Sequence, residues 1–259
     1  MVALPAALIA AGIAIWLSLG SKTATPSVCR VAAGTSRYSV DLAQASNATT
    51  ITAVGKRLGF PDHAVTIALA TALQESQLHN LSYGDRDSLG LFQQRPSQGW
   101  GSAKQIMKPE YAASAFFKAL GRIHGWQTMS ITAAAQAVQH SDAPDAYASW
   151  EPLARALAIT TTGESPAGLA CEFSPTRSNS PPPSPIPALT QQLGRSQLAA
   201  PGSSKRGWII VSWLVGHAEQ YRITKVEFAG RAWTPAGTWR ATRAGGPGIQ
   251  ITQAAASGQ

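Results

Sequence analysis

The stretch that decides the fold reads Ala64-Val65-Thr66-Ile67-Ala68-Leu69-Ala70-Thr71-Ala72-Leu73-Gln74-Glu75-Ser76. Apolar residues and threonines cover nearly all sides of a helix here, so the pattern predicts a buried central helix. Glu75 follows where the apolar run ends. A carboxyl group at that point is poorly solvated, which favours the protonated form that a general acid needs. The alternative is that Glu75 simply ends the helix as a surface residue.

The loop after this helix reads Gly84-Asp85-Arg86-Asp87-Ser88-Leu89-Gly90-Leu91-Phe92-Gln93-Gln94-Arg95-Pro96. Its glycines permit a close backbone approach to a ligand, and the Gln93 amide can both donate to and accept from sugar groups. Asp85 and Asp87 follow Glu75 closely enough to fold back over it. Each is a candidate second carboxylate for glycoside cleavage, or a loop residue engaged in side-chain turns and a pair with Arg86.

Two linked motifs in this region resemble the lysozyme-like superfamily, in particular soluble lytic transglycosylases and goose-type lysozymes. Those families carry a catalytic Glu-Ser at a helix end and then a Gly-Leu-[Met/Phe]-Gln turn, and this chain has Glu75-Ser76 followed by Gly90-Leu91-Phe92-Gln93 at the transglycosylase spacing. The resemblance covers about residues 40–160 and implies a lysozyme-like helical domain. It implies Glu75 as general acid and Asp85 as an acidic residue of the goose-type loop. The substrate-binding residues that it implies are Ser76, Gly90, Leu91, Phe92 and Gln93.

One motif of the transglycosylases is missing. They carry Ala-Tyr-Asn on a later helix, with the tyrosine in contact with the acid, whereas the corresponding residues 135–141 contain no tyrosine. Gln136 or Gln139 is a substitute sugar contact, or else belongs to a solvated helix face. Three aromatic residues near the expected cleft can stack on sugars, although single aromatics near helices more often pack in the core. They are Trp100, Tyr147 and Trp150.

The composition is that of a folded, basic chain. It has 259 residues, of which 44% are hydrophobic, and a formal net charge of +8, which excludes a disulfide miniprotein and a disordered chain. Basic proteins concentrate at anionic polymers, and the peptides and polyanions of a cell wall are anionic. Lys and Arg are spread along the chain without a basic helix, so we expect no nucleic-acid partner.

The N-terminal segment Val2–Leu19 is the one stretch apolar enough to meet a bilayer, which excludes a polytopic transporter. Its length is near the lower limit for a membrane span, so it is either an uncleaved anchor or a long signal segment. We favour the anchor. The expected location is therefore extracytoplasmic, tethered to the membrane through this segment or secreted to the cell wall.

The chain has two cysteines, Cys29 and Cys171, at the two borders of the expected helical domain. This placement predicts a disulfide that closes the domain, as in exported proteins, the alternative being two unrelated buried thiols. Neither cysteine has a second Cys or His at metal-binding spacing, and the five histidines are scattered. We therefore expect no metal and no cofactor.

The expected fold class is mainly α, in four segments. Residues 1–28 are the anchor or signal and spacer, 29–171 the lysozyme-like helical domain, 172–204 a Pro/Ser-rich extended linker, and 205–259 a small α/β module. No convincing alternating strand is found before residue 205. Besides the central helix, capping and periodicity predict helices over residues 41–58, 109–123, 130–139 and 145–159.

The small module is expected to contain a helix over residues 208–221 and strands over 225–228, 231–234 and 249–252. It resembles a small domain of actinobacterial cell-wall proteins. Relatives of that kind can carry alternating histidines on the last strand, but Gly248–Thr252 has none, so no metal site is expected there. We interpret the module as a binding or packing appendage.

These observations predict an exported enzyme that cleaves the β-1,4 bond between N-acetylmuramic acid and N-acetylglucosamine in peptidoglycan. Whether water or a sugar hydroxyl completes the reaction stays open at this point. The rival hypothesis is a non-catalytic peptidoglycan-binding or scaffold protein that keeps the lysozyme-like fold. A metal-handling envelope protein is excluded because the chain offers no cluster of ligands.

Overall fold

The computed structural model describes residues 27–140, 145–194, 198–243 and 246–256, and the predicted anchor Val2–Leu19 lies outside them. The prediction of a mainly α fold is wrong. The chain is mixed α/β, with 45% helix, 16% strand and two antiparallel sheets. No helix in the described ranges is both long enough and apolar enough to cross a membrane.

The first sheet was missed by the sequence analysis. It has the order β2-β1-β3, with β1 over Val28–Ala33, β2 over Ser36–Val40 and β3 over Leu169–Glu172. The signal was present: β1 buries every second residue, and the two-residue turn to β2 contains Gly34 at a φ of +56°. A glycine in a two-residue connection is typical of hairpins. These strands are short, and two of them lie at the start of the segment 29–171, which we expected to be helical.

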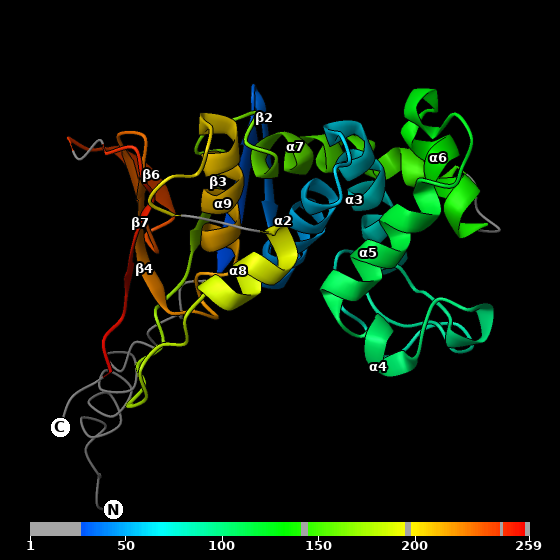
Figure 1. The fold of residues 1–259 in the computed structure, drawn as a ribbon, viewed down its shortest axis with the longest axis horizontal. Coiled ribbons are helices and arrows are strands. Elements are labelled where there is room, and N and C mark those ends of the chain that lie inside the picture. The colour runs from blue at the N-terminus through cyan, green and yellow to red at the C-terminus, as the bar shows by residue number, and fades with distance from the viewer. Residues whose placement is uncertain (1–26, 141–144, 195–197, 244–245, 257–259) are drawn as a thin grey trace, which may run out of the picture.

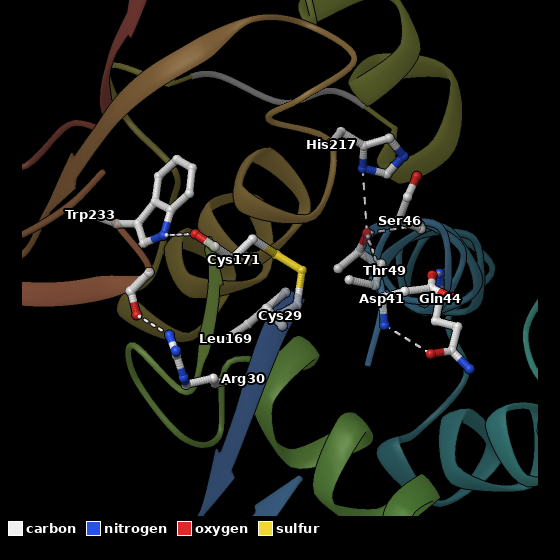
Figure 2. Close-up of a disulfide and its surroundings, with 12 residues drawn as sticks. Cys29, Arg30, Asp41, Gln44, Ser46, Thr49, Leu169, Cys171, His217 and Trp233 are labelled. Atoms are coloured by element: carbon white, nitrogen blue, oxygen red, sulfur yellow. Dashed lines mark hydrogen bonds between the residues drawn. A yellow bond between two sulfur atoms is a disulfide. The ribbon is translucent and has the colours of Figure 1, made fainter. Parts of the chain in front are cut away.

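The predicted disulfide is confirmed. Cys29 and Cys171 lie directly opposite each other on β1 and β3, with their Cα atoms 3.8 Å apart, and a bond joins their sulfur atoms (Figure 2). This separation is shorter than the roughly 4.4 to 6.8 Å that is usual for disulfides. Disulfides persist in oxidising compartments, so the protein functions outside the cytoplasm.

The helices around the central helix follow the predicted pattern. Helix α2 spans Leu42–Arg57, and its N-cap Asp41 forms a capping box with Gln44. Helix α3, the central helix, spans Asp62–Ser76 and is buried continuously from Ala64 to Leu73. Both helices were predicted, and so was the burial of α3 on all sides.

Of the remaining helical elements, α4, α5 and α6 form one end of the molecule, whereas α7 lies beside the first sheet and α3 (Figure 1). The predicted helix over 145–159 is instead a 3-10 turn followed by α7, because Pro152 fits only the first turn of an α-helix. The elements of this part are η1 Pro96–Gln98, α4 Ala103–Ile106, α5 Pro109–Leu120, η2 Trp126–Thr128, α6 Ile131–Gln139, η3 Ala146–Trp150 and α7 Glu151–Thr161.

The C-terminal part forms the opposite end. Helix α9, Ser204–Gly216, packs between α2 and the second sheet (Figure 1). That sheet has the order β6-β5-β4-β7, and β6 had not been predicted. Its strands are β4 Ile223–Phe228, β5 Arg231–Thr234, β6 Thr238–Ala241 and β7 Gln250–Gln253.

Two tryptophans dock the C-terminal part on the first sheet. The indole N–H of Trp233 donates to the Cys171 carbonyl at 3.1 Å (Figure 2), and that of Trp239 donates to the Leu169 carbonyl at 2.8 Å. Both carbonyls lie on the edge of β3 that faces away from β1. The indole N–H groups thereby bond to carbonyls of an edge strand, which could otherwise pair with a strand of another chain.

The expectation of a fully extended linker is also wrong. Helix α8, Ile186–Leu193, lies within it and packs on α2, with Leu189 and Leu193 fully buried. The proline-rich stretch before α8 is held as well, because Gln253 donates to the Pro183 carbonyl at 2.8 Å. The two leucines stand one helical turn apart, which gives α8 an apolar side that the overall Pro/Ser composition concealed.

Candidate functional site

The end of α3 that carries Glu75 is held in place by α2. Gln77 and Leu78, just beyond α3, both have positive φ values, so the chain turns sharply after the helix. The side-chain amide of Gln44 donates to the Gln77 carbonyl at 2.9 Å, and that of Asn47 donates to the Leu78 carbonyl at 2.7 Å. Carbonyl groups at a helix end need such partners. The half-buried Glu75 is therefore fixed on a rigid support.

Tyr147 is the direct partner of Glu75. Its hydroxyl group, on the fully buried side chain of a residue in η3, donates to Glu75 Oε1 at 2.9 Å. Within the described residues, Glu75 Oε2 has no hydrogen-bond partner. One carboxyl oxygen is thus oriented by the protein, while the other stays available for chemistry.

This contact was missed in the sequence, where the aligned segment 135–141 has no tyrosine. A buried tyrosine hydroxyl needs a polar partner, and that need was the available signal. Trp150, three residues later, donates from its indole N–H to Gln74 Oε1 at 2.8 Å. Tyr147 and Trp150 of η3 therefore each donate a hydrogen bond to the end of α3, to Glu75 and Gln74 respectively. These bonds explain the positions of both aromatic side chains without a stacked sugar.

Ser76 connects the helix end to the glycine-containing turn. It is 6% exposed, and its hydroxyl group donates to the Leu91 carbonyl at 2.8 Å. The structure thus brings Ser76 and the Gly90–Gln93 turn together. Ser76 lies beneath the turn, where it aligns the turn with Glu75.

The turn itself is built on a buried apolar base. Gly90 has a φ of +74°, and a Cβ atom there would lie 2.9 Å from the Ile106 carbonyl oxygen, so no other residue fits. Leu91 and Phe92 are fully buried, and Phe92 stacks on Phe116 with ring centroids 4.6 Å apart. Their side chains anchor the turn from below.

Gln93 is half-buried and lies against Gly84. Its amide nitrogen donates to the carbonyls of Tyr83 and Gly90, each at 3.3 Å. A Cβ atom at Gly84 would overlap the Gln93 side-chain oxygen. The glycine therefore leaves the space in which the Gln93 amide sits, and the loop and the turn form one unit.

Gln139 joins the same turn from the end of α6. Its side-chain amide donates to the Phe92 carbonyl at 2.9 Å, so it contacts the turn rather than a solvated helix face. It also lines a cavity of about 640 Å³, together with Trp100 and residues of α5. Glu75 does not line that cavity, and the contact between the two regions runs through the turn.

The two loop aspartates differ in their surroundings. The side chain of Asp85 is 90% exposed and lies 3.8 Å from the Arg86 guanidinium. Asp87 accepts from Arg95 Nε at 2.7 Å and from the backbone N–H of Ser97 at 2.8 Å. The hydrogen bond from Arg95, followed by that from Ser97, holds the pKa of Asp87 far below its ordinary value. Asp87 is therefore ionised and cannot act as a proton donor.

Within the described ranges, no group of three or more His, Cys, Asp or Glu side chains is placed to hold a metal ion. A scan of protein-family models finds no family that matches the chain, and a search of curated proteins finds no match. The proposed chemistry therefore rests on the residues and their geometry.

Proposed function

We propose that this protein cleaves peptidoglycan glycan strands, with Glu75 as the general acid. The observation that carries the proposal is the hydrogen bond from the Tyr147 hydroxyl group to one oxygen of the Glu75 carboxyl group. Among the described residues it leaves the other oxygen without a hydrogen bond, at the end of a buried helix and beside the Gly90–Gln93 turn. Orientation of a catalytic carboxyl group by a buried donor is a common requirement of general acid catalysis.

In the proposed reaction, Glu75 Oε2 gives its proton to the glycosidic oxygen as the bond from that oxygen to C1 of N-acetylmuramic acid breaks. The resulting carboxylate then takes the proton of the attacking hydroxyl group, which bonds to C1. Glu75 acts first as acid and then as base, so the proton balance closes.

The surroundings of the aspartates favour the sugar's own 6-hydroxyl group as the nucleophile. An inverting hydrolase needs a second carboxylate to hold water opposite the acid. Asp87 accepts hydrogen bonds from Arg95 and Ser97, and the Asp85 side chain is largely exposed to solvent. Neither makes a hydrogen bond to Glu75. A single-carboxyl mechanism yields 1,6-anhydromuramyl ends, the product of a lytic transglycosylase.

The location and charge of the protein support this substrate. The Cys29–Cys171 disulfide belongs to an oxidising compartment outside the cytoplasm, where peptidoglycan lies. The net charge of +8 attracts the protein to the anionic wall. We propose that Val2–Leu19 either tethers the protein to the membrane or directs its secretion.

The test is mass spectrometry of the muropeptides released from purified sacculi. The full chain should release fragments with anhydromuramyl ends, whereas Glu75→Gln, which keeps the shape and removes the transferable proton, should release them at least about a hundredfold more slowly. Glu219→Gln is the matched control, because Glu219 is exposed and its side chain has no partner among the described residues. Equal release by Glu75→Gln would refute the role of Glu75.

The rival function is peptidoglycan binding without cleavage, which the absence of the Ala-Tyr-Asn motif favoured. Tyr147 now supplies a tyrosine contact to Glu75 from a different segment, which removes that argument against catalysis. If the full chain binds sacculi but releases no fragments, the binding function replaces the enzymatic one. Reducing ends in place of anhydro ends would instead indicate hydrolysis.

A further inference from the structure

The cavity of about 640 Å³ beside the turn has a sharply divided lining. The cavity is lined by the end of η1 and the two residues that follow it, by one face of α5, and by the end of α6. Tyr111 and Lys118 on α5 and Arg122 just beyond it recur at helical spacing, so they present one face to the cavity. One part of that lining is aromatic and uncharged, and another part is cationic.

The cationic part consists of Lys118 and Arg122, one helical turn apart. Both are exposed, and no acidic residue in the described ranges pairs with either of them. No acidic side chain of those ranges lines the cavity. Arg95, by contrast, is paired with Asp87. Two unmatched cations at the rim of a cavity attract an anionic group.

The uncharged part has the chemistry of a sugar site. Trp100 and Tyr111 are half-buried, and the Tyr111 hydroxyl group donates to the Trp100 carbonyl at 3.3 Å, which holds the two residues together. Half-buried aromatic rings of this kind offer a flat apolar surface with polar groups at its edge. Gln139 adds an amide whose oxygen has no hydrogen-bond partner within the described residues.

We propose that this cavity binds the peptide-bearing muramyl unit of peptidoglycan, with the sugar against Trp100 and Tyr111 and the carboxylates of the stem peptide at Lys118 and Arg122. The inference rests on the proposed function for its substrate and names the part of that substrate the protein selects. A ligand with a neutral sugar and separate carboxylates matches the divided lining better than a uniformly charged polyphosphate does. Gln139 lines the cavity and also donates to the Phe92 carbonyl of the turn beside Glu75, so the cavity and the turn are neighbours.

The test is calorimetric binding to the full chain carrying Glu75→Gln, which prevents turnover. Two probes are compared: the N-acetylglucosaminyl-N-acetylmuramic acid disaccharide with its stem peptide, and the disaccharide with the lactyl carboxyl group amidated and no peptide. The peptide-bearing probe should bind about tenfold more tightly. Adding Lys118→Gln and Arg122→Gln should abolish that preference, and high salt should weaken it.

The matched control is Arg231→Gln with Arg240→Gln, which removes the same charge from exposed positions of the second sheet, at the opposite end of the molecule (Figure 1). It should keep the preference. Equal affinity for the two probes, or displacement of the peptide-bearing probe by low concentrations of a glycerol phosphate polymer, would overturn the inference. Binding is measured on Glu75→Gln and cleavage on the wild type, so the two results are independent. If Glu75→Gln shows no preference for the peptide-bearing probe while the wild type cleaves sacculi, only this inference is refuted. Preference without cleavage by wild type refutes the enzymatic function alone.

Discussion

The hydroxyl group of Tyr147 and the carboxyl group of Glu75 lie 2.9 Å apart, although 72 residues separate them in the sequence. The tyrosine is on a 3-10 turn, and the glutamate is at the end of the central helix. The packing of η3 against α3 therefore decides how the candidate acid is oriented.

Tyr147→Phe should lower the rate of sacculus cleavage by about tenfold to a hundredfold, because the acid loses its fixed orientation. Loss of the hydrogen bond to Glu75 should by itself lower the free energy of unfolding by only about 1 to 2 kcal/mol. Rates of muropeptide release and urea unfolding measure the two effects. Tyr38→Phe is the control, because the Tyr38 hydroxyl group has no hydrogen bond within the described residues. An unchanged rate in Tyr147→Phe would show that the contact is only structural.

Gly84→Ala should impair cleavage about as much as Gln93→Ala does, because a methyl group at Gly84 occupies the space of the Gln93 side-chain oxygen. The added atom would also lie 2.8 Å from the Ser88 carbonyl oxygen, so Gly84→Ala should lose some stability as well, and urea unfolding shows that the rates are compared for folded protein. Gly246→Ala, where the added atom meets nothing within 4 Å, is the matched control. The measurement is the sacculus-cleavage rate of the wild type and the three variants. Full activity of Gly84→Ala together with loss of activity in Gln93→Ala would contradict the prediction.

The helix that carries Glu75 and the turn that faces it were both predictable from the sequence, because an apolar run and a glycine motif are local patterns. The partner of Glu75 was not. A hydrogen bond between Tyr147 and Glu75 depends on how η3 packs on α3, and no local pattern encodes that contact. The buried positions of Ser76 and Phe92 were equally out of reach, since a motif does not reveal which of its side chains face the substrate.

Replacing both Cys29 and Cys171 with serine should lower the melting temperature by about 5 to 15 °C. Loss of the cross-link restores unfolded-state entropy worth several kcal/mol for a loop of 142 residues. Differential scanning calorimetry of the variant, with and without reductant, measures the change. Reductant should affect the wild type only, and a variant as stable as the wild type would contradict the expectation.

His217 should make the fold sensitive to mild acid. It is fully buried against α2, near Thr49 (Figure 2), and burial lowers its pKa from 6.5 to about 4. The unfolded chain therefore binds a proton first as the pH falls. Stability is complete above about pH 6.5 and should decrease by about 3 kcal/mol on going down to pH 4.

Thermal melting of wild type and His217→Gln across this range tests the expectation. The variant starts less stable because it loses the stacking of the ring on Trp213, whose centroid lies 4.0 Å away. Its stability should nevertheless change less between pH 6.5 and pH 4. Parallel curves for the two proteins would assign the acid sensitivity to other groups.

Trypsin should cut the native protein at the exposed Arg177, and the two fragments should then remain together. Trp233 and Trp239 hold the C-terminal part on β3, and α8 and α9 both pack on α2. Size-exclusion chromatography of the digest, with mass spectrometry of the peak, makes the comparison. Separate elution of the fragments would contradict the docked arrangement.

The departures from the predicted fold have a common cause. The strands β1, β2 and β3 are only four to six residues long, and β3 pairs with β1 across the whole helical domain, so no local pattern predicts that pairing. Helix α8 was hidden because the prolines around it set the average composition of the segment. Elements stabilised by their own periodicity, such as α2, α3 and α5, were predicted within a few residues.

The central place of β1 in the first sheet also affects how the chain acquires its structure. β1 needs β3 as a neighbour, and β3 follows only after the entire helical region has been synthesised. Pairing over such a distance is slow compared with helix formation. We therefore expect β3 to pair with β1 late in folding, and Cys29 to remain a free thiol until then. Because the chain has only two cysteines, no wrong pairing within one molecule exists. Oxidative maturation therefore needs an oxidant but no disulfide isomerase, and its one competing reaction is cross-linking between molecules, which dilution suppresses.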